Sequence, residues 1–227
     1  KRCLEINSEV DLAYFSLGDI SFNNGEMIEA IEYFSEGLKI NPEKINAYLI
    51  RGIAYLNLSQ NQEAISDFSK AIELNPSYAE ANDAYTNRGR AKDGLNDFSG
   101  AVEDYTKALD IDPTAMDVYL SRANSKANME DYEGSIDDFN KLIEYDSTLA
   151  VAFIGRGGSK LNLGDYQGAI DDYSKSLEMD EDTDFVHIYL GHAKKELGDR
   201  KGACEDWKKA AELGDEDAAK LLEEHCE

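Results

Sequence analysis

The hexapeptide Gly37-Leu38-Lys39-Ile40-Asn41-Pro42 occurs three times in the chain in related forms. It returns as Ala-Ile-Glu-Leu-Asn-Pro at residues 71–76 and as Ala-Leu-Asp-Ile-Asp-Pro at residues 108–113. Each copy ends at one of the chain's three prolines, and the intervals between these prolines are 34 and 37 residues. A period of this size is typical of stacked supersecondary units, each too small to bury its apolar face alone. The chain is therefore predicted to be one repeat array.

Numbering each block so that its proline stands at place 32 gives six consecutive blocks. They span residues 11–44, 45–81, 82–115, 116–149, 150–183 and 184–217. Places 8 and 20 hold small residues in every block. Place 24 is aromatic throughout, as Phe34, Phe68, Tyr105, Phe139, Tyr173 and Trp207. Large and small residues at these intervals have the 3.6-residue period of a helix, so each block is predicted to form two amphipathic helices.

This pattern resembles the tetratricopeptide repeat over residues 11–217. Departures are local: blocks 4 to 6 lack the proline, and block 6 has His187 at place 4, where an aromatic residue is expected. The resemblance implies an all-α fold, a right-handed α-solenoid of stacked antiparallel helix pairs. It also implies a non-enzymatic interaction module that binds a peptide or helix of another protein in its concave groove. The alternative is an architectural or self-associating segment of a larger protein whose catalytic or secretory part is not in this chain.

The two ends extend the repeat pattern. Residues 4–8 align with residues 38–42, so residues 1–10 are expected to be a remnant second helix of a preceding repeat. A native capping helix is the alternative. Residues 218–227 are expected to form a C-terminal capping helix that hides the last apolar face from water.

Composition excludes several classes of function. The chain of 227 residues has 23 basic and 47 acidic residues, and its net charge of −24 disfavours nucleic acid and anionic membranes as partners. A basic protein segment is compatible with this charge, although acidic faces also serve solubility alone. No stretch is long and apolar enough for membrane insertion.

The three cysteines, Cys3, Cys204 and Cys226, argue against a disulfide framework. Cys204 stands at place 21, where the other blocks have isoleucine or valine, and is therefore interpreted as a core residue. Free thiols favour a cytoplasmic location, with a cleaved export signal as the alternative.

No motif indicates an enzyme, a cofactor or a metal site. Residues 155–160 look like a phosphate loop but lack its Gly-Lys-Ser/Thr ending, and they fall inside a predicted helix. Residues 180–191 begin with the spacing of a calcium loop but lack its glycine and its closing glutamate. Gly155 and Gly158 satisfy no packing rule of the repeat, so the helix that contains them is expected to be locally weak.

A charge pattern predicts structural ion pairs. Place 7 is arginine and place 23 is aspartate in blocks 2 to 5, and these two places should face each other within a block. The pairs are Arg51 with Asp67, Arg88 with Asp104, Arg122 with Asp138, and Arg156 with Asp172. The planar guanidinium suits a partly buried, bidentate contact with a carboxylate. A row of arginines that binds anionic ligands is the rival interpretation.

The resemblance also implies where a partner would bind. Ligand contacts in the family come from places 2, 5, 9, 12 and 13 of the first helices. In blocks 1 to 3 this groove comprises Leu12, Phe15, Asp19, Phe22, Asn46, Leu49, Ile53, Leu56, Asp83, Thr86 and Arg90. In blocks 4 to 6 it comprises Asp117, Leu120, Asn124, Val151, Ile154, Leu161, Phe185, Ile188 and His192. Exposed apolar residues that cluster on a concave face indicate a binding surface.

The order of these residues predicts the chemistry of the partner. Polar residues of block 3 separate the apolar groove residues of blocks 1 and 2 from those of blocks 4 to 6. A partner with two apolar anchors and a basic middle would match them. This hypothesis requires Leu49 and Ile154 to be open to the groove.

The longer second interval predicts one local difference between the blocks. Three extra residues lie between Pro76 and Tyr85, and most residues there are good helix formers. The first helix of block 3 is therefore expected to begin about one turn early, near residues 77–79.

Overall fold

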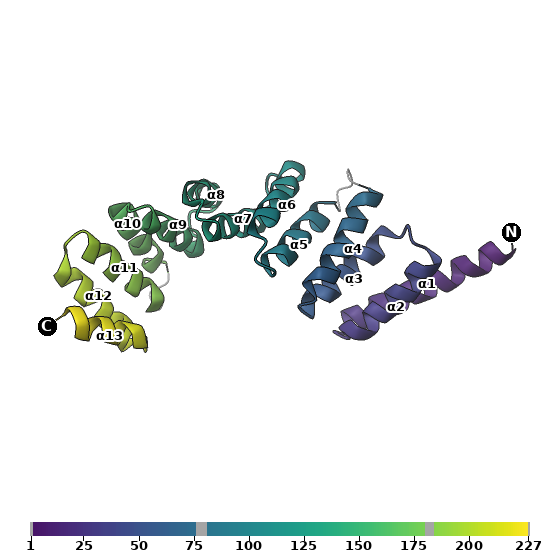
Figure 1. Cartoon of the computed structure of the whole chain (residues 1–227), viewed down its shortest axis with the longest axis horizontal. Helices are drawn as coiled ribbons and strands as arrows, with labels where there is room; N and C mark the ends of the chain where they lie inside the picture. Colours follow the sequence, from purple (N-terminus) through teal and green to yellow (C-terminus); the bar gives the residue numbers. More distant parts are fainter. Residues whose placement is uncertain (1, 76–80, 180–183, 227) are drawn as a thin grey trace. The chain divides into compact units, whose positions relative to one another are not determined.

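A computed structural model describes residues 2–75, 81–179 and 184–226 of the chain. These residues form thirteen helices and no strand (Figure 1). The helices are α1 (Arg2–Asn23), α2 (Met27–Ile40), α3 (Ile45–Asn57), α4 (Asn61–Leu74), α5 (Ala81–Asp93), α6 (Phe98–Ile111), α7 (Met116–Asn128), α8 (Tyr132–Tyr145), α9 (Ala150–Asn162), α10 (Tyr166–Leu177), α11 (Asp184–Glu196), α12 (Arg200–Glu212) and α13 (Glu216–His225).

The helices group into two compact units, Lys1–Val118 and Tyr119–Glu227. In the first unit α1 packs on α2, α3 on α4 and α5 on α6. In the second unit α9 packs on α10, and α11 on α12. Each pair is an antiparallel hairpin, and neighbouring hairpins stack through contacts such as those of α4 with α5 and of α10 with α11. The all-α solenoid of stacked helix pairs that the sequence predicts is confirmed.

Within a hairpin, the aromatic residue at place 24 packs against the glycine at place 8. Phe68 is fully buried, and a Cβ atom added to Gly52 would meet its ring at 2.8 Å. Tyr105 and Gly89 repeat this contact in block 3. A larger residue at place 8 would push the two helix backbones apart, so this large–small pairing sets the distance between the helices.

Between hairpins, the first helix of one block completes the core of the block before it. Ala84 and Ala91, at places 3 and 10 of block 3, pack into the buried cluster that contains Phe68 and Leu49. Val186 and Ala193 occupy the same places of block 6 and join the cluster around Tyr173. Blocks 2 and 5 therefore bury their apolar faces together with the block that follows each of them.

The turns inside the hairpins share one backbone feature. The residue at place 15 has a positive φ in every block; in blocks 1, 5 and 6 it is glycine. Block 4 has Glu130 there, at φ 63°, a conformation that costs a residue with a Cβ more than it costs glycine. In blocks 3 to 6 the aspartate at place 16 then caps the second helix, as Asp97 does by accepting a hydrogen bond from the Gly100 amide.

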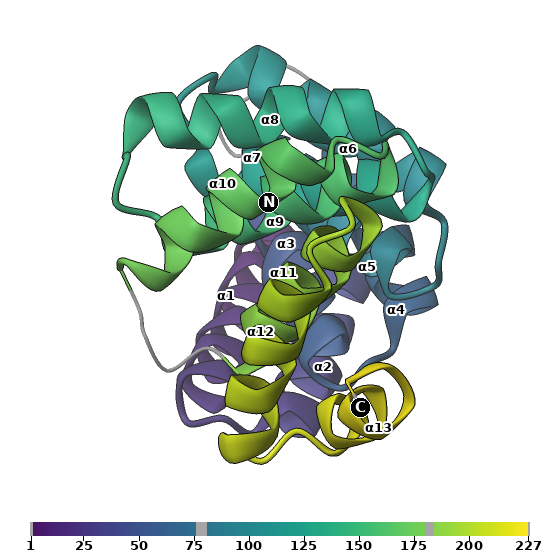
Figure 2. The same cartoon turned by 90° about the vertical axis from the view of Figure 1, so that its left-hand side faces the viewer.

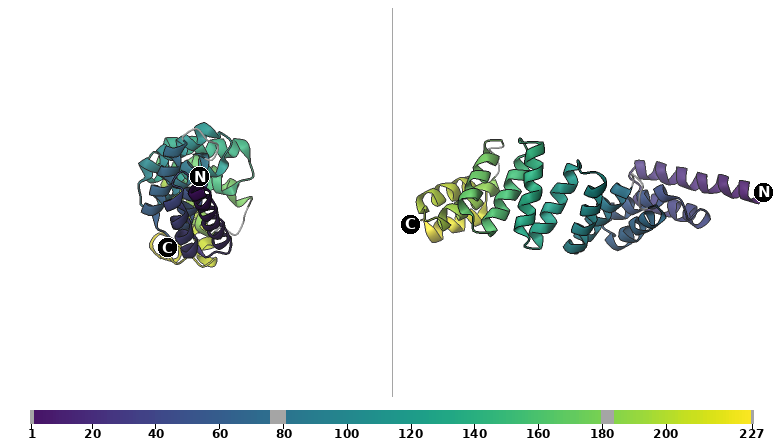
Figure 3. Two further views of the ribbon diagram at one scale, coloured as in Figure 1. Left: turned by 90° about the vertical axis from the view of Figure 1, so that its right-hand side faces the viewer. Right: turned by 90° about the horizontal axis from the view of Figure 1, so that it is seen from above.

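The helix is continuous across the expected N-terminal boundary. Residues 2–23 form one helix, with no turn between residues 10 and 11, where the expected remnant helix would end. Other blocks make that turn over about four residues, as at residues 41–44 between α2 and α3. Figure 3 shows the N-terminal part of α1, in purple, continuing past the end of α2. The sequence in this region has neither a proline nor a glycine that would end the helix.

At the other end, α13 packs on α12 and covers its outer face, as Figures 1 and 2 show. Ala218 is fully buried there, and Leu221 and Leu222 are half-buried. Helix α13 begins at Glu216, two residues before the expected start of the capping helix. The expected early start of the first helix of block 3 falls on residues 76–80, which lie outside the described residues.

Gly155 corrects another expectation. Helix α9 is continuous from Ala150 to Asn162, and a Cβ atom on Gly155 would collide with the ring of Phe139 in the preceding block. This glycine therefore has a packing role that the repeat pattern does not reveal. The nearest atom to a Cβ on Gly158 would be 3.7 Å away, an ordinary contact, so Gly158 has no such role.

Candidate protein-binding surface

The four arginine–aspartate pairs form within their blocks. In each pair, Nε and Nη2 of the arginine donate to the two carboxylate oxygens, at N–O distances of 2.6 to 2.9 Å. The aspartates are 3 to 4% exposed, and each guanidinium also lies 5.4 to 5.6 Å from the centre of the aromatic ring at place 4 of its block. The arginine therefore connects the two helices of its hairpin.

The same arginines also join neighbouring blocks. Arg51 donates through Nη1 to the Ser35 hydroxyl at 2.8 Å, and Arg156 to the Asn140 side-chain oxygen at 2.6 Å. Ser35 and Asn140 stand at place 25 of the preceding block, a role that the charge pattern does not indicate. Because the guanidinium is engaged on three sides, it is not free to bind an external anion.

A lysine that the sequence analysis did not single out completes this network. In blocks 3 to 6 the residue at place 11 is lysine, and its ammonium lies 2.6 to 2.8 Å from the aspartate at place 23. Block 2 has Tyr55 at this place, so Asp67 has Arg51 as the cation paired with it. In blocks 3 to 5 this lysine follows the place-7 arginine by four residues, so both lie on one helix face. That spacing could have revealed the lysine from the sequence.

Burial opposes ionisation of the Asp67 carboxyl group. It raises the pKa of Asp67 more than the hydrogen bonds from Arg51 lower it. The same hydrogen bonds raise the pKa of Arg51 although burial acts against them, so the guanidinium stays charged. A buried pair of this kind specifies helix alignment rather than adding much net stability.

One concave site lies on the first helices of blocks 2 and 3. It is a cavity of about 220 Å³ between α3 and α5, with Leu49, Ile50 and Ile53 as apolar lining. Asn46, Asp83 and Asn87 supply the polar part of its wall. Asn46 and Asp83 are exposed, so they form the rim of this cavity. Ile50 and Asn87, both at place 6, were not among the expected groove residues.

Several expected groove residues are buried instead. Leu49 is 8% exposed and packs with Phe68. It therefore forms the buried wall of the cavity and is not an exposed anchor for a partner. Phe15 is 5% exposed and packs over Gly37, and Thr86 is 5% exposed. These three residues stand at place 5 of their blocks. In blocks 1 and 2 the following block covers place 5, because Phe15 packs in a cluster with Ala47 and Leu49 in a cluster with Ala84.

The other groove residues of the first unit remain accessible to different degrees. Leu12 is 57% exposed and Asp19 is exposed, while Phe22 and Leu56 are half-buried. Arg90 and Asp117 form an exposed ion pair between α5 and α7, with an N–O distance of 2.9 Å.

In the second unit, place 2 is open and place 5 is half-buried. Val151 and Phe185 are 49% and 43% exposed. Asn124 is exposed as well. The half-buried residues are Leu120, Ile154, Leu161, Ile188 and His192.

Block 6 replaces the arginine pair with a different arrangement around Asp206. Leu190 stands at place 7, and His187 stands at place 4 instead of a tyrosine or phenylalanine. His187 Nδ1 lies 3.5 Å from one oxygen of Asp206, and the Lys194 ammonium lies 2.6 Å from the other. His187 is 7% exposed, and burial lowers its pKa although Asp206 acts to raise it.

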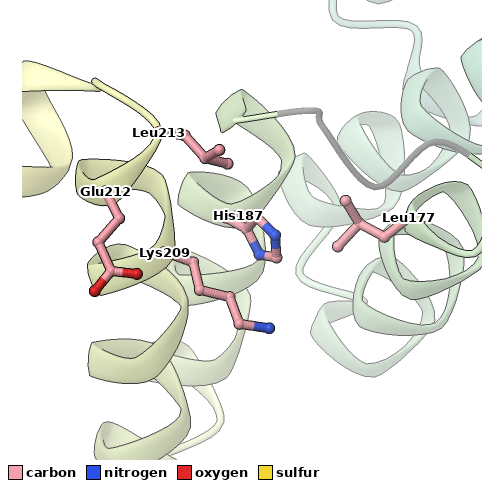
Figure 4. A pocket seen from close by; sticks show the side chains of 5 residues that line it. All are labelled: Leu177, His187, Lys209, Glu212 and Leu213. Carbon is pink, nitrogen blue, oxygen red and sulfur yellow. The ribbon is translucent and has the colours of Figure 1, made fainter.

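A cavity of about 480 Å³ opens beside this histidine (Figure 4). It is lined by His187, Lys209, Glu212 and two leucines, Leu177 and Leu213. The His187 imidazole occupies less space than the tyrosine ring that stands at place 4 in blocks 1 to 4. Comparable cavities also lie beside Tyr85 and Tyr119, so the space is a repeated feature of the hairpin rather than a specific site.

Two of the cysteines are paired, although the sequence analysis expects free thiols. Cys204 on α12 and Cys226, the residue after α13, form a disulfide with a Cα–Cα distance of 5.8 Å. Cys204 is therefore not a free core residue. The two residues are 22 apart in sequence and meet because α13 folds back on α12, which spacing alone does not show. Because disulfides are ordinary in oxidising compartments, the cysteines no longer favour the cytoplasm.

Among the described residues, no group of three or more histidine, cysteine or acidic side chains could hold a metal ion. None of the helices searched there has the length and hydropathy needed to cross a membrane.

Comparison with known proteins agrees with the helix pairs. Sequence profiles described as tetratricopeptide repeat match residues 11–44, 45–78, 83–114, 117–149 and 152–183. No curated protein matches the chain.

Solved structures share the fold at low sequence identity. The crystal structure of YrrB, described as a tetratricopeptide-repeat protein with an unusual peptide-binding site, has a TM-score of 0.73 at 19% identity. That comparison covers 86% of this chain and 100% of YrrB. The C-terminal part of a repeat protein from Cytophaga hutchinsonii has a TM-score of 0.77 at 22% identity, over 92% of this chain and 83% of that one.

PilW, a type IV pilus biogenesis factor, has a TM-score of 0.71 at 21% identity, over 94% of this chain and 98% of its own. At these identities the likeness concerns the fold alone. The sequence profiles, by contrast, match well over half of the chain, block by block. The chain therefore belongs to the tetratricopeptide repeat family.

Proposed function

We propose that the chain is a non-enzymatic binding module that holds a segment of another protein against the first helices of its blocks. The observation that carries this proposal is the cavity between α3 and α5, with an apolar lining and an amide and carboxylate rim. A pocket with this composition accepts one apolar side chain while the rim bonds to the backbone beside it.

Charge indicates the kind of segment. Asp83 lies on the rim of the cavity, and the whole chain has a net charge of −24. A segment with an apolar anchor next to lysine or arginine would therefore be attracted and oriented by the surface. YrrB, which shares the fold, is described as having a peptide-binding site, and this agrees with the same mode of use.

The proposal can be tested with peptides selected from a random phage-displayed library against the wild-type chain. Their dissociation constants are measured by fluorescence anisotropy for the wild type, Ile53→Ala and Asp83→Lys. We expect Ile53→Ala to weaken binding about tenfold through lost apolar contact. Asp83→Lys should weaken binding of basic peptides and slow their association.

Glu32→Lys is the matched control, because Glu32 is exposed on α2, a second helix of its block, and the charge change is identical. Its dissociation constants should stay near those of the wild type. Circular dichroism checks that all variants remain helical. Selected peptides that bind Ile53→Ala and Asp83→Lys as tightly as the wild type would contradict the proposal, as would a library that yields no binder.

A further inference from the structure

A cavity of about 280 Å³ lies among helices α11, α12 and α13, and we call it the α13 cavity. Its wall comprises Lys195 from α11, Arg200, Ala203, Cys204 and Trp207 from α12, and Glu224 and His225 from α13. It shares no residue with the cavity between α3 and α5, so the proposed function assigns it no role.

The wall of the α13 cavity is cationic, although the chain is strongly acidic. Lys195 and Arg200 face the cavity with a single carboxylate, that of Glu224, whereas the whole chain has 47 acidic against 23 basic residues. Neither Lys195 nor Arg200 forms an ion pair among the described residues. The Lys195 ammonium lies 3.4 Å from Nε2 of His225 instead. The cavity therefore offers two cations to an external anion.

One sulfur of the disulfide between Cys204 and Cys226 belongs to this wall. Cys204 is half-buried and lines the cavity, and Cys226 is not among the lining residues. Exchange between a thiol and a disulfide requires a thiolate to reach one of the two sulfurs, and its rate depends on access and on nearby charge. The geometry thus selects Cys204 as the sulfur that is attacked. The two cations favour an acidic thiol as the reagent.

The exchange with such a thiol balances without any other reactant. The reagent thiolate attacks Sγ of Cys204, a new sulfur–sulfur bond forms there, and the bond to Cys226 breaks, so that Cys226 leaves as a thiolate. A second reagent thiolate attacks the reagent sulfur that is bound to Cys204, and Cys204 also leaves as a thiolate. Both cysteine thiolates take up protons from water. The two reagent molecules end as one disulfide and have supplied the two electrons.

The position of α13 depends on the bond that this exchange breaks. The helix has 10 residues, and isolated helices shorter than about 12–15 residues are marginal in water. Its packing is limited, since Ala218 is fully buried while Leu221 and Leu222 are half-buried. The disulfide joins the residue that follows this helix to α12. Once the bond is open, a small apolar contact is left to hold α13 on α12.

We propose that the α13 cavity is a reaction site for small thiols that carry carboxylates, and that their exchange with Cys204 releases α13 from α12. Lys195 and Arg200 bind the carboxylates, and Cys204 accepts the sulfur. Trp207, the single tryptophan of the chain, reports the release, because the ring of His225 on α13 lies 5.7 Å from its ring. Departure of His225 changes the surroundings of the indole and hence its fluorescence.

The test compares two reagents with the same thiol group, glutathione and its diethyl ester, in which both carboxylates are masked. The full chain carries Cys3→Ser, so that Cys204 and Cys226 are its remaining cysteines. Alkylation and mass spectrometry follow the loss of the disulfide, and each rate is divided by the thiolate concentration of the reagent. We expect glutathione to react on the order of tenfold faster than the ester at low salt. The charge of the whole chain predicts the opposite order, because it repels glutathione.

Lys195→Ala combined with Arg200→Ala should abolish the preference for glutathione. The matched control is Lys201→Ala combined with Lys208→Ala, since both lysines are exposed on α12, stand outside the cavity wall and give the same change of charge. It should keep the preference. Because the ratio of two rates is measured for each protein, a general loosening of α13 changes both rates together and leaves the ratio as it was.

Trp207 fluorescence should change with the same time course as the loss of the disulfide. An ester that reacts as fast as glutathione with the Cys3→Ser protein would overturn the proposal. A control that loses the preference as fully as the Lys195 and Arg200 variant would overturn it as well. Fluorescence that stays constant while the disulfide is lost would show that the exchange does not release α13.

Discussion

At the scale of single residues, the structure distinguishes positions that look alike in the sequence. Gly155 and Gly158 lie one helical turn apart in α9, and neither belongs to the repeat pattern. Only Gly155 faces a ring, that of the buried Phe139, whereas Gly158 has ordinary space around it. An added side chain should therefore change the free energy of unfolding in opposite directions at these two positions.

Gly158→Ala is expected to stabilise the second unit by up to about 1 kcal/mol, the difference in helix propensity between glycine and alanine. Gly155→Ala should destabilise it by about 1–3 kcal/mol, because the added methyl group displaces Phe139 from a filled core. Urea unfolding followed by circular dichroism measures both changes. Equal effects of the two substitutions would show that packing against Phe139 is unimportant.

The buried aspartates allow a similar comparison. Arg51→Leu leaves Asp67 without its cation, because block 2 has Tyr55 where the later blocks have a lysine. Arg88→Leu leaves Asp104 paired with Lys92 at 2.8 Å. We expect Arg51→Leu to cost about 3–5 kcal/mol, the usual cost of an uncompensated buried charge, and Arg88→Leu clearly less. Denaturant titration of both variants checks the order, and the reverse order would contradict the role assigned to the lysines.

At the scale of the helix and its block, block 6 and the capping helix α13 depart most from the pattern. Block 6 holds Asp206 with a histidine and a lysine in place of an arginine. Helix α13 is fixed by a disulfide as well as by packing. Both features concern the hairpin of α11 and α12.

The histidine makes the stability of this hairpin depend on pH. Burial lowers the pKa of His187 below its ordinary value of 6.5, so the unfolded chain binds the proton at a higher pH than the folded chain does. Stability is then present above about pH 6.5 and falls as the pH drops below that value. Lys194 and Lys209 act in the same direction, while Asp206 opposes it.

His187→Phe, which restores the phenylalanine that block 5 has at place 4, should lose part of this dependence between pH 8 and pH 5.5. The remaining part is assigned to His192, whose pKa burial also lowers. Thermal melting of both proteins across this range provides the measurement. A wild type and variant with parallel pH profiles would exclude His187 as the cause.

The disulfide is expected to hold α13 in place. Cys226→Ser should lower the stability of the last hairpin by about 2–4 kcal/mol, since the closed loop no longer restricts the unfolded chain. Hydrogen exchange at the amides of α13 should accelerate strongly, while that of α9 stays unchanged. Cys3→Ser is the control, and faster exchange in that variant as well would show that loss of any cysteine has the same effect.

At the scale of the whole molecule, charge is the dominant property. The net charge of −24 is spread over a chain whose core clusters are small and repeated, so repulsion between acidic side chains opposes folding throughout. Many of the ion pairs among the described residues are exposed, and each contributes little to stability. Salt should therefore weaken the repulsion between acidic side chains more than it weakens the attraction within the ion pairs.

Raising NaCl from about 20 to about 500 mM shortens the Debye length from roughly 20 to roughly 4 Å. We expect the melting temperature at pH 7 to rise by several degrees. Near the isoelectric point of 4.4 the same addition should have little effect, because the repulsion is absent. A lower melting temperature in salt at pH 7 would show that ion pairs outweigh repulsion.

The sequence alone determined the helix pairs and the residues that pack inside each of them. Glycine at place 8, an aromatic residue at place 24 and the arginine–aspartate pair all act within about twenty residues, and each pattern is repeated four to six times, which makes its meaning clear. The tertiary structure decided which faces stay open. Leu49 and Phe15 are covered by the neighbouring block, whereas Asn46 and Asp83 stay open at the rim of the cavity. Cys204 meets Cys226 only because α13 folds back. Such contacts depend on how one hairpin lies on the next, and no spacing within a single block contains that information.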